Sequence, residues 1–209
     1  DFECEVVIAC VGLQSDRLAL RSKMEIEERI APFRGSWLAV RSELTGIVRR
    51  NIYPVPQQGL PFLGVHLTPR VDGQLWIGPN AVLAPAREAR QKWSMNRRDL
   101  VDIIRNPGIW RLGAREWQTA IGEVARDLSV HLMMQSVRRY VPSLQDQDVA
   151  PGPWGVRAQL VQRDGSLIDD FRIVRDRRVF HVLNAPSPAA TAAFAIGAHL
   201  RDEVLPMLG

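Results

Sequence analysis

The sequence predicts a mixed fold of the α+β or α/β class, and three stretches of the chain carry the prediction. Residues 5–10 are a continuous apolar run, which is typical of a strand covered on both faces in a parallel sheet. Residues 30–78 form short alternating apolar segments, whereas residues 96–140 place apolar side chains every three or four positions. Because similar layers at both ends enclose a different middle, we expect two interleaved lobes.

The composition is that of a globular chain. Its 209 residues are 46% hydrophobic and 24% charged, enough for one substantial core or two small lobes. No apolar run approaches the roughly 20 residues that cross a bilayer, so we expect a soluble protein. The formal charge of +4 rests on arginine, since only Lys23 and Lys92 are lysines. Arginine suits bidentate binding of carboxylate or phosphate, although a GC-rich genome would favour it too. The basic residues have acidic neighbours, which argues against a nucleic-acid partner.

The two cysteines, Cys4 and Cys10, lie an even number of residues apart in the first predicted strand. They therefore share a face and are too far apart to bond. We expect both to be core thiols in a reducing compartment, and we expect no metal site because no histidine accompanies them. The chain starts at Asp1 and enters a buried-type strand almost at once, so we expect a fragment of a longer protein.

The first half of the chain is predicted to be mostly strands. The first strand ends at Val11-Gly12, and a short helix begins near Ser15. Prolines and glycines, among them Pro32 and Gly35, then divide residues 30–78 into short strands joined by turns. Asp72-Gly73 is a hairpin signal.

The second half begins with two predicted helices. Asn106-Pro107-Gly108 separates them, and Pro142 ends the second. Residues 150–153 resemble a linker, and strands follow at residues 155–162, 171–174 and 179–183, with a turn at Asp164-Gly165. An alanine-rich helix from about residue 188 to residue 205 closes the chain.

Two of the predicted strands carry candidate site residues. Alternation groups Arg157 with Gln159 on one face of their strand, and His66 with Thr68 on one face of theirs. If these strands are neighbours, the four side chains line one sheet face. An arginine fork would hold a carboxylate, and a neutral histidine would accept a hydroxyl proton near pH 7. The alternative is that this face simply points to water.

A second candidate site lies where the strand at residues 179–183 leads into the last helix. Small residues and two prolines occupy this segment. Unpaired backbone amides at the helix start would present partial positive charge to an anion or an electron-rich ring. An ordinary helix that begins at a proline and packs through alanines is the alternative.

Seven ordered motifs resemble a known family over nearly the whole chain. They are residues 10–17 (CVGLQSDR), 32–35 (PFRG), 52–56 (IYPVP), 61–66 (PFLGVH), 78–82 (GPNAV), 155–159 (GVRAQ) and 184–191 (NAPSPAAT). The set resembles the L-2-hydroxyglutarate oxidase and dehydrogenase family of D-amino-acid-oxidase-like flavoproteins. The resemblance implies part of that fold: residues 1–25 and 163–209 would be remnants of the FAD-binding domain. Residues 26–162 would be a substrate-binding domain, an antiparallel sheet with helices at residues 97–140.

The resemblance also implies an activity, namely oxidation of L-2-hydroxyglutarate to 2-oxoglutarate by hydride transfer from C2 to the flavin N5. Electrons would then leave to oxygen or a membrane carrier. Arg157 would clamp a substrate carboxylate with help from Gln159 and Thr68, and His66 would be the base. The residues implied to face FAD are Gly12, Pro186, Ser187, Pro188, Ala189 and Ala190. The implied compartment is the cytoplasm, with membrane association as a variant, or the mitochondrion in a eukaryote.

Two departures from the family qualify these expectations. Val11 stands where the family more usually has alanine, and its larger side chain would crowd the cofactor. The G-x-G-x-x-G turn that holds the pyrophosphate is absent, so we expect weak or no FAD binding by this chain. A related flavoenzyme acting on glycerol 3-phosphate or an amino acid, and a non-catalytic module, remain as alternatives.

Overall fold

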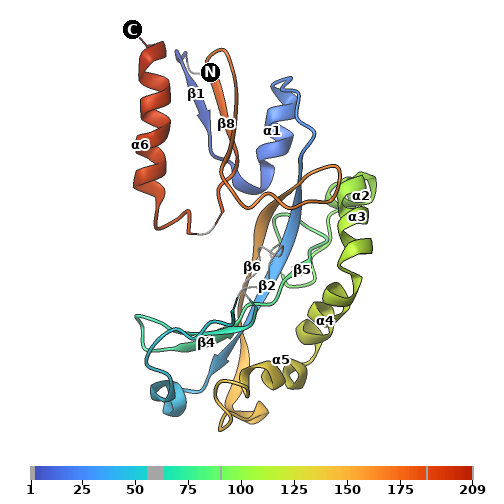
Figure 1. The fold of residues 1–209 in the computed structure, drawn as a ribbon, viewed down its shortest axis with the longest axis vertical. Helices are drawn as coiled ribbons and strands as arrows, with labels where there is room; N and C mark the ends of the chain where they lie inside the picture. The colour runs from blue at the N-terminus through green and yellow to red at the C-terminus, as the bar shows by residue number, and fades with distance from the viewer. Residues whose placement is uncertain (1–2, 56–63, 90, 187, 209) are drawn as a thin grey trace.

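The computed structural model describes residues 3–55, 64–89, 91–186 and 188–208, which form two sheets (Figure 1). The smaller sheet has the order β1 (Val7–Ala9), β8 (Val179–Asn184) and β7 (Arg172–Asp176). The larger sheet has the order β3 (His66–Pro69), β4 (Leu75–Gly78), β2 (Arg29–Val40) and β5 (Val82–Leu83), and β6 (Val149–Val161) pairs with β2. Only β1 and β8 are parallel, so the mixed fold is confirmed.

The longest feature of the fold is the antiparallel ribbon of β2 and β6. Its register runs from Arg29 opposite Val161 to Val40 opposite Val149, with an irregularity between Ser36 and Leu38. Two predictions are therefore wrong: the strand breaks at Pro32 and Gly35, and the linker at residues 150–153. All of these residues lie inside the two strands. Residues 150–153 belong to an edge strand beside the irregularity, where a missing amide donor is tolerated.

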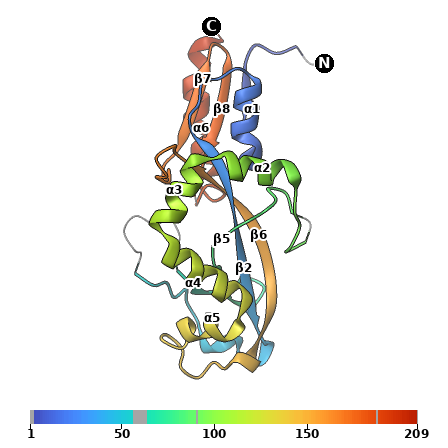
Figure 2. The same cartoon turned by 90° about the vertical axis from the view of Figure 1, so that its right-hand side faces the viewer.

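Four helices, rather than the two predicted, follow one another along the ribbon (Figure 2). They are α2 (Arg97–Arg105), α3 (Pro107–Arg115), α4 (Trp117–Leu128) and α5 (Val130–Val137). The side chains of Asn96, Asn106 and Ser129 each accept a backbone N–H of the helix that follows. The predicted second helix is thus three helices, because Ser129 caps a new one and the chain bends at Glu116.

The core has two parts. The larger cluster packs strand residues such as Leu38, Leu67 and Ile77 against Met134 and Val137 of α5. The smaller cluster joins the two sheets, because Ala19, Ile30, Leu160 and Leu183 meet in it. Ala19 belongs to α1 (Ser15–Arg21), which follows the short η1 (Gly12–Gln14). The remaining elements are η2 (Ser42–Ile47), η3 (Asp146–Asp148), α6 (Ala193–Val204) and η4 (Leu205–Met207).

Several local predictions are confirmed. The turns at Asp72-Gly73 and Asp164-Gly165 lie where expected, and both glycines have positive φ angles, of 82° and 89°. Strands β7 and β8 and helix α1 also occupy the predicted segments. The first and last segments of the chain share the smaller sheet, as the idea of interleaved lobes requires. The domain boundaries themselves remain a prediction.

The first strand differs from its prediction. Cys4 and Cys10 are exposed free thiols, not core thiols. Val7 and Ile8 are each 43% exposed, and only Ala9 of β1 is buried. The physical reason is that β1 is an edge strand of a three-stranded sheet, paired with β8 alone. Nothing in the described residues covers its second face.

None of the described helices has both the length and the apolar character needed to pass through a bilayer. Within the same residues, no group of three or more histidine, cysteine, aspartate or glutamate side chains is arranged to hold a metal ion.

Candidate functional site

His66 lies against the middle of β2, on the side away from α4 and α5. Ser36 donates its hydroxyl to Asp127 of α4, and Leu38 packs against α5. Trp37, between them, points the other way by strand alternation and meets the His66 ring edge-on, with ring centroids 5.3 Å apart. The connection from β8 to α6 lies on this same side of the ribbon (Figure 1).

Aromatic rings enclose His66, and a backbone carbonyl sets its tautomer. The Tyr53 ring lies over the imidazole, with ring centroids 4.5 Å apart. His66 is only 7% exposed. Nδ1 lies 3.0 Å from the carbonyl oxygen of Gly64. A carbonyl can only accept, so Nδ1 carries the proton of the neutral ring and donates it. The lone pair therefore lies on Nε2, which makes no hydrogen bond within the described residues.

Burial lowers the pKa of His66, and the nearby charge of Arg157 lowers it further, although the Gly64 hydrogen bond opposes both effects. His66 is therefore neutral near pH 7. A neutral imidazole with an available Nε2 is the form that a general base requires. The charge of Arg157 thus acts on His66, but the shared site of the two side chains stays a prediction.

Arg157 is exposed on β6 and makes no salt bridge or hydrogen bond within the described residues. It lies opposite Phe33 of β2, in the middle of the long ribbon. An arginine in the middle of a sheet with no internal partner keeps its guanidinium fork available for an anion from outside.

The other two predicted substrate-binding residues differ from each other. Thr68 Oγ1 is buried and has no hydrogen-bond partner among the described residues. Gln159 instead donates from Nε2 to the carbonyl oxygens of Ile168, at 2.9 Å, and Leu160, at 3.4 Å. These bonds hold the turn after β6.

The condition set for a shared face, that the two strands are neighbours, is not met. Strands β3 and β6 are not neighbours, because β4 and β2 lie between them. The ribbon also twists along its length, as strands do. Ile30 of β2 packs toward Leu183 of β8, whereas Leu38, which alternation places on the same face, packs toward α5. Gln159 therefore faces the turn after its own strand, and a face shared by Arg157 and His66 stays a prediction.

The predicted cofactor-facing residues follow the ends of two adjacent parallel strands. Ala9 of β1 pairs with His181 of β8. Gly12 lies three residues after the end of β1, and Pro186 lies two residues after the end of β8. Ligands of open α/β sheets bind outside the carboxyl ends of such strands. Gly12 has a φ of 53°, and no atom lies within 4 Å of where its Cβ would stand, so its backbone is open to a close ligand. These residues fit a dinucleotide.

The turn before α6 is not the predicted first turn of a helix. Helix α6 begins at Ala193, not near residue 188. The Ala189 amide donates to Pro186 and the Ala192 amide to Pro188, at 2.9 and 3.0 Å, because two prolines form a separate turn here. These two amides are therefore not available to an anion. Ser187 lies outside the described residues.

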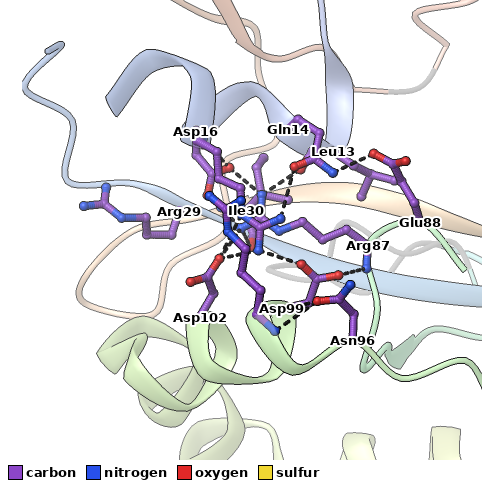
Figure 3. Close-up of polar contacts among 12 residues, drawn as sticks. Leu13, Gln14, Asp16, Arg29, Ile30, Arg87, Glu88, Asn96, Asp99 and Asp102 are labelled. Carbon is purple, nitrogen blue, oxygen red and sulfur yellow. Dashed lines mark hydrogen bonds and ion pairs between the residues drawn. The ribbon is translucent and has the colours of Figure 1, made fainter. Parts of the chain in front are cut away.

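A cluster of buried ion pairs was not predicted (Figure 3). Arg87 is 2% exposed and donates to both carboxylate oxygens of Asp16, at 2.5 and 2.9 Å. Arg17 binds Asp99 at 2.6 Å and Asp102 at 2.5 Å. Burial lowers the pKa of Arg17, but the two carboxylates outweigh it and raise the pKa overall. Each cation is matched, so the cluster is structural.

The ion pairs and the aromatic enclosure escape sequence reasoning for different reasons. Asp16 and Arg87 are 71 residues apart, so no local pattern connects them. Trp37 carries a usable signal, because alternation in β2 sets it on the face opposite Leu38. Tyr53 has none, since it lies in an irregular segment that reaches β3 through the single bridge between Ile52 and Leu67.

Comparison with known proteins gives consistent matches. Residues 1–203 match the family described as FAD dependent oxidoreductase. The mitochondrial L-2-hydroxyglutarate dehydrogenase of Nematostella vectensis is 47% identical over 208 residues, covering 96% of this chain and 45% of that protein. The Homo sapiens protein of the same name is 41% identical, covering 98% and 45%. L-2-hydroxyglutarate dehydrogenase of Escherichia coli K12 is 42% identical, covering 100% and 49%. The chain spans about half the length of these relatives.

Proposed function

Because the chain belongs to the FAD dependent oxidoreductase family, we propose that it forms the substrate-facing part of an enzyme that oxidises L-2-hydroxyglutarate to 2-oxoglutarate. The observation that carries the proposal is the pairing of an exposed, unpaired Arg157 with a buried, neutral His66. A 2-hydroxy acid needs both: a cation for its carboxylate and a base for its hydroxyl proton. The names of the relatives supply the particular acid.

The residues of this chain have separate tasks in the proposed reaction. Arg157 holds one carboxylate of the substrate through its two parallel N–H groups. His66 accepts the hydroxyl proton at Nε2, while the Gly64 carbonyl keeps the ring in the required tautomer. Thr68 Oγ1, which is buried without a partner in the described residues, is the hydroxyl proposed to meet a substrate oxygen. FAD, when bound, supplies the acceptor for the hydride that leaves C2.

The cofactor would lie along Gly12 and the turn at residues 186–190, which meet at the carboxyl ends of β1 and β8. Electrons would pass on to oxygen or to a membrane carrier. We place the protein in mitochondria if its source is a eukaryote, since eukaryotic relatives carry that word in their names, and otherwise in the cytoplasm or at a membrane.

Turnover by the natural-length protein tests the proposal. The FAD-loaded protein is assayed with a soluble dye as electron acceptor and with L-2-hydroxyglutarate, D-2-hydroxyglutarate, glycerol 3-phosphate or an amino acid as substrate. We expect turnover with L-2-hydroxyglutarate far above the others. Efficient turnover of glycerol 3-phosphate or an amino acid instead would refute the proposed substrate. A protein without flavin absorbance and without activity would refute the enzymatic role.

A further inference from the structure

Tyr53 lies over the proposed base but has no assigned task in the proposed reaction. Its ring is stacked on the His66 imidazole, with ring centroids 4.5 Å apart and an angle of 33° between the ring planes. Trp37 meets the same imidazole edge-on, at 5.3 Å and 88°. Tyr53 is 46% exposed, whereas Trp37 is half-buried. Tyr53 is therefore the outer wall of the enclosure around His66, and Trp37 is the inner wall.

The residue before Tyr53 is fixed to the strand that carries the base. Ile52 exchanges two backbone hydrogen bonds with Leu67 of β3, and each joins N to O over 3.0 Å. Leu67 is fully buried, and Ile52 packs against the larger core cluster. Because Leu67 directly follows His66, this bridge sets the Tyr53 ring beside the imidazole.

The residue after Tyr53 is fixed as well. A Cβ at Gly64 would lie 3.2 Å from Cγ of Pro54, so a glycine at this position allows residues 52–54 to approach residues 64–67 closely. The carbonyl of Gly64 is the group that accepts the Nδ1 proton of His66. The hydrogen bond that orients the imidazole and the ring that covers it therefore depend on the same two packed segments.

A ring in this position serves a base in two ways. It excludes water from His66, and this loss of hydration is the largest of the causes that lower the pKa of His66. It also occupies the space into which the imidazole would have to turn if it left the Gly64 carbonyl. A general base must be both unprotonated and correctly aimed, so both effects favour proton transfer.

The charges around the imidazole do not account for the same effect. Among the described residues, Arg157 of β6 is the charged group that acts on His66, and it lowers the histidine pKa in the same direction as burial. Trp37 of β2 and Trp76 of β4, whose rings lie 5.8 Å apart, are uncharged. Arg70, the next cation along the chain from His66, lies 3.8 Å from the Trp76 ring centroid, not over the imidazole. Losing the outer wall should therefore act on the histidine through hydration, not through a charge.

We propose that Tyr53 is a positioning residue for the base: its ring closes the solvent side of the enclosure and holds the imidazole in the orientation that presents Nε2 to the substrate hydroxyl. The inference rests on the proposed function, because Tyr53 has this task only if His66 is the base. The ring, not the phenol hydroxyl, carries the task, since the contact is between the two rings. Phenylalanine should thus replace this tyrosine without loss.

Acylation of His66 by diethyl pyrocarbonate tests the wall without relying on turnover. The reagent attacks unprotonated imidazole nitrogens, so its rate at His66, read by mass spectrometry of the peptide, reports exposure, and the pH dependence of the rate reports the pKa. The natural-length FAD-loaded protein is used without substrate. Tyr53→Ala should react severalfold faster above pH 7, and its midpoint should rise toward 6.5, the ordinary pKa of histidine. Tyr53→Phe should match the unchanged protein.

Steady-state kinetics separate positioning from substrate binding. With L-2-hydroxyglutarate, Tyr53→Ala should lower kcat at least about tenfold, because a misplaced reacting group costs up to about a hundredfold. The KM, which depends on Arg157 in the proposed reaction, should change little. The acid limb of kcat/KM should move to higher pH together with the histidine pKa. Tyr53→Leu keeps apolar bulk for folding and should change every readout in the same direction, but less.

Tyr140→Ala is the matched control, because Tyr140 is the other tyrosine of the chain and is 37% exposed. It should leave every readout unchanged. An unaltered acylation rate and midpoint in Tyr53→Ala would overturn the proposal. So would a Tyr53→Phe variant as impaired as Tyr53→Ala, since the hydroxyl would then carry the effect. Absence of turnover in the unchanged protein would refute the proposed function and with it the task of Tyr53, even where acylation confirms the wall.

Discussion

Arg157 and His66 have opposite surroundings, and the difference gives each its proposed task. Arg157 is exposed and unpaired on β6, whereas His66 is enclosed by Trp37 and Tyr53. A carboxylate-binding group must be accessible and charged, while a base must lose its own charge. Strand alternation predicts both positions. It cannot predict the enclosure, because Tyr53 comes from a segment without periodicity.

Replacing Arg157 with lysine tests the guanidinium fork. The variant keeps the charge but loses the two parallel N–H donors, so the KM for L-2-hydroxyglutarate should rise at least about tenfold, as expected for a lost charge-assisted hydrogen bond. Steady-state kinetics of the FAD-loaded protein measure it. Arg175→Lys, on the exposed part of β7, is the control and should leave KM unchanged. An unaltered KM for Arg157→Lys would remove this residue from the site.

Histidine protonation should make the fold sensitive to acid. Burial lowers the pKa of both His66 and His181, so each folded pKa lies below the unfolded value of 6.5. Between these values the unfolded chain binds more protons than the folded one. Stability is therefore complete above the unfolded pKa and declines as pH falls toward the folded pKa.

His181 offers the clearer test of that dependence, because both of its ring nitrogens are buried without partners. His181→Leu should reduce the loss of unfolding free energy between about pH 7.5 and about pH 5.5. Urea unfolding at the two pH values measures it, and the exposed His199→Gln is the control. If His181→Leu loses as much stability on acidification as the unchanged chain, His181 does not carry this effect.

At the scale of the elements, the contact between α3 and the end of β6 depends on Gly108. A Cβ at this position would lie 2.1 Å from the Gln162 carbonyl oxygen. Gly108→Ala should therefore force the helix away from the strand and destabilise the fold by about 1–3 kcal/mol or more. Gly113, in the same helix, has nothing within 4 Å of its Cβ position. Gly113→Ala should stabilise by up to about 1 kcal/mol through helix propensity.

Urea unfolding of the two alanine variants measures both effects. The comparison is matched, because the same substitution is made twice in one helix. Equal stabilisation at both positions would mean that helix propensity, not the close approach to β6, governs Gly108. Far-ultraviolet circular dichroism of each variant checks that the helices remain.

Element prediction succeeded where a local signal decides the structure and failed where a distant partner does. The turns at Gly73 and Gly165 need a positive φ, which glycine supplies, so sequence finds them. The β2–β6 ribbon passes through prolines and glycines because each strand supports the other along its whole length. The sequence of either strand taken alone gives no sign of this pairing. The break between α4 and α5 has a local signal, because Ser129 is a typical capping residue. The apolar spacing continues on both sides of Ser129, however, and predicts one unbroken helix.

At the scale of the whole molecule, the two ends of the chain build one sheet. β1 and β8 are parallel neighbours, and their apolar character predicts a common layer. The contacts that connect this layer to the larger sheet cannot be predicted from composition. The cluster around Asp16 makes the connection. Asp16 of α1 accepts the Ile30 amide of β2 at 2.9 Å and binds Arg87, and the Arg87 amide donates to Asp99 of α2.

Asp16→Asn should therefore weaken the joint between the two sheets more than it disturbs either sheet. It leaves the buried Arg87 charge with only the Asp102 carboxylate, 3.7 Å away, which should cost about 3–5 kcal/mol of unfolding free energy. Asp202→Asn breaks an ion pair with Arg201 in which both side chains are more than 60% exposed, and it should cost at most about 1 kcal/mol. Thermal unfolding followed by circular dichroism and by tryptophan fluorescence measures both variants.

The fluorescence probe adds a directional test, because all six tryptophans lie outside the smaller sheet. If the cluster joins two otherwise separate units, Asp16→Asn should lower the midpoint of the circular dichroism signal more than that of the tryptophan signal. The double variant Asp16→Asn, Arg87→Met should recover part of the loss, since it removes the stranded charge. Coincident midpoints with no recovery would show instead that the two sheets unfold as one unit in which this ion pair has no special role.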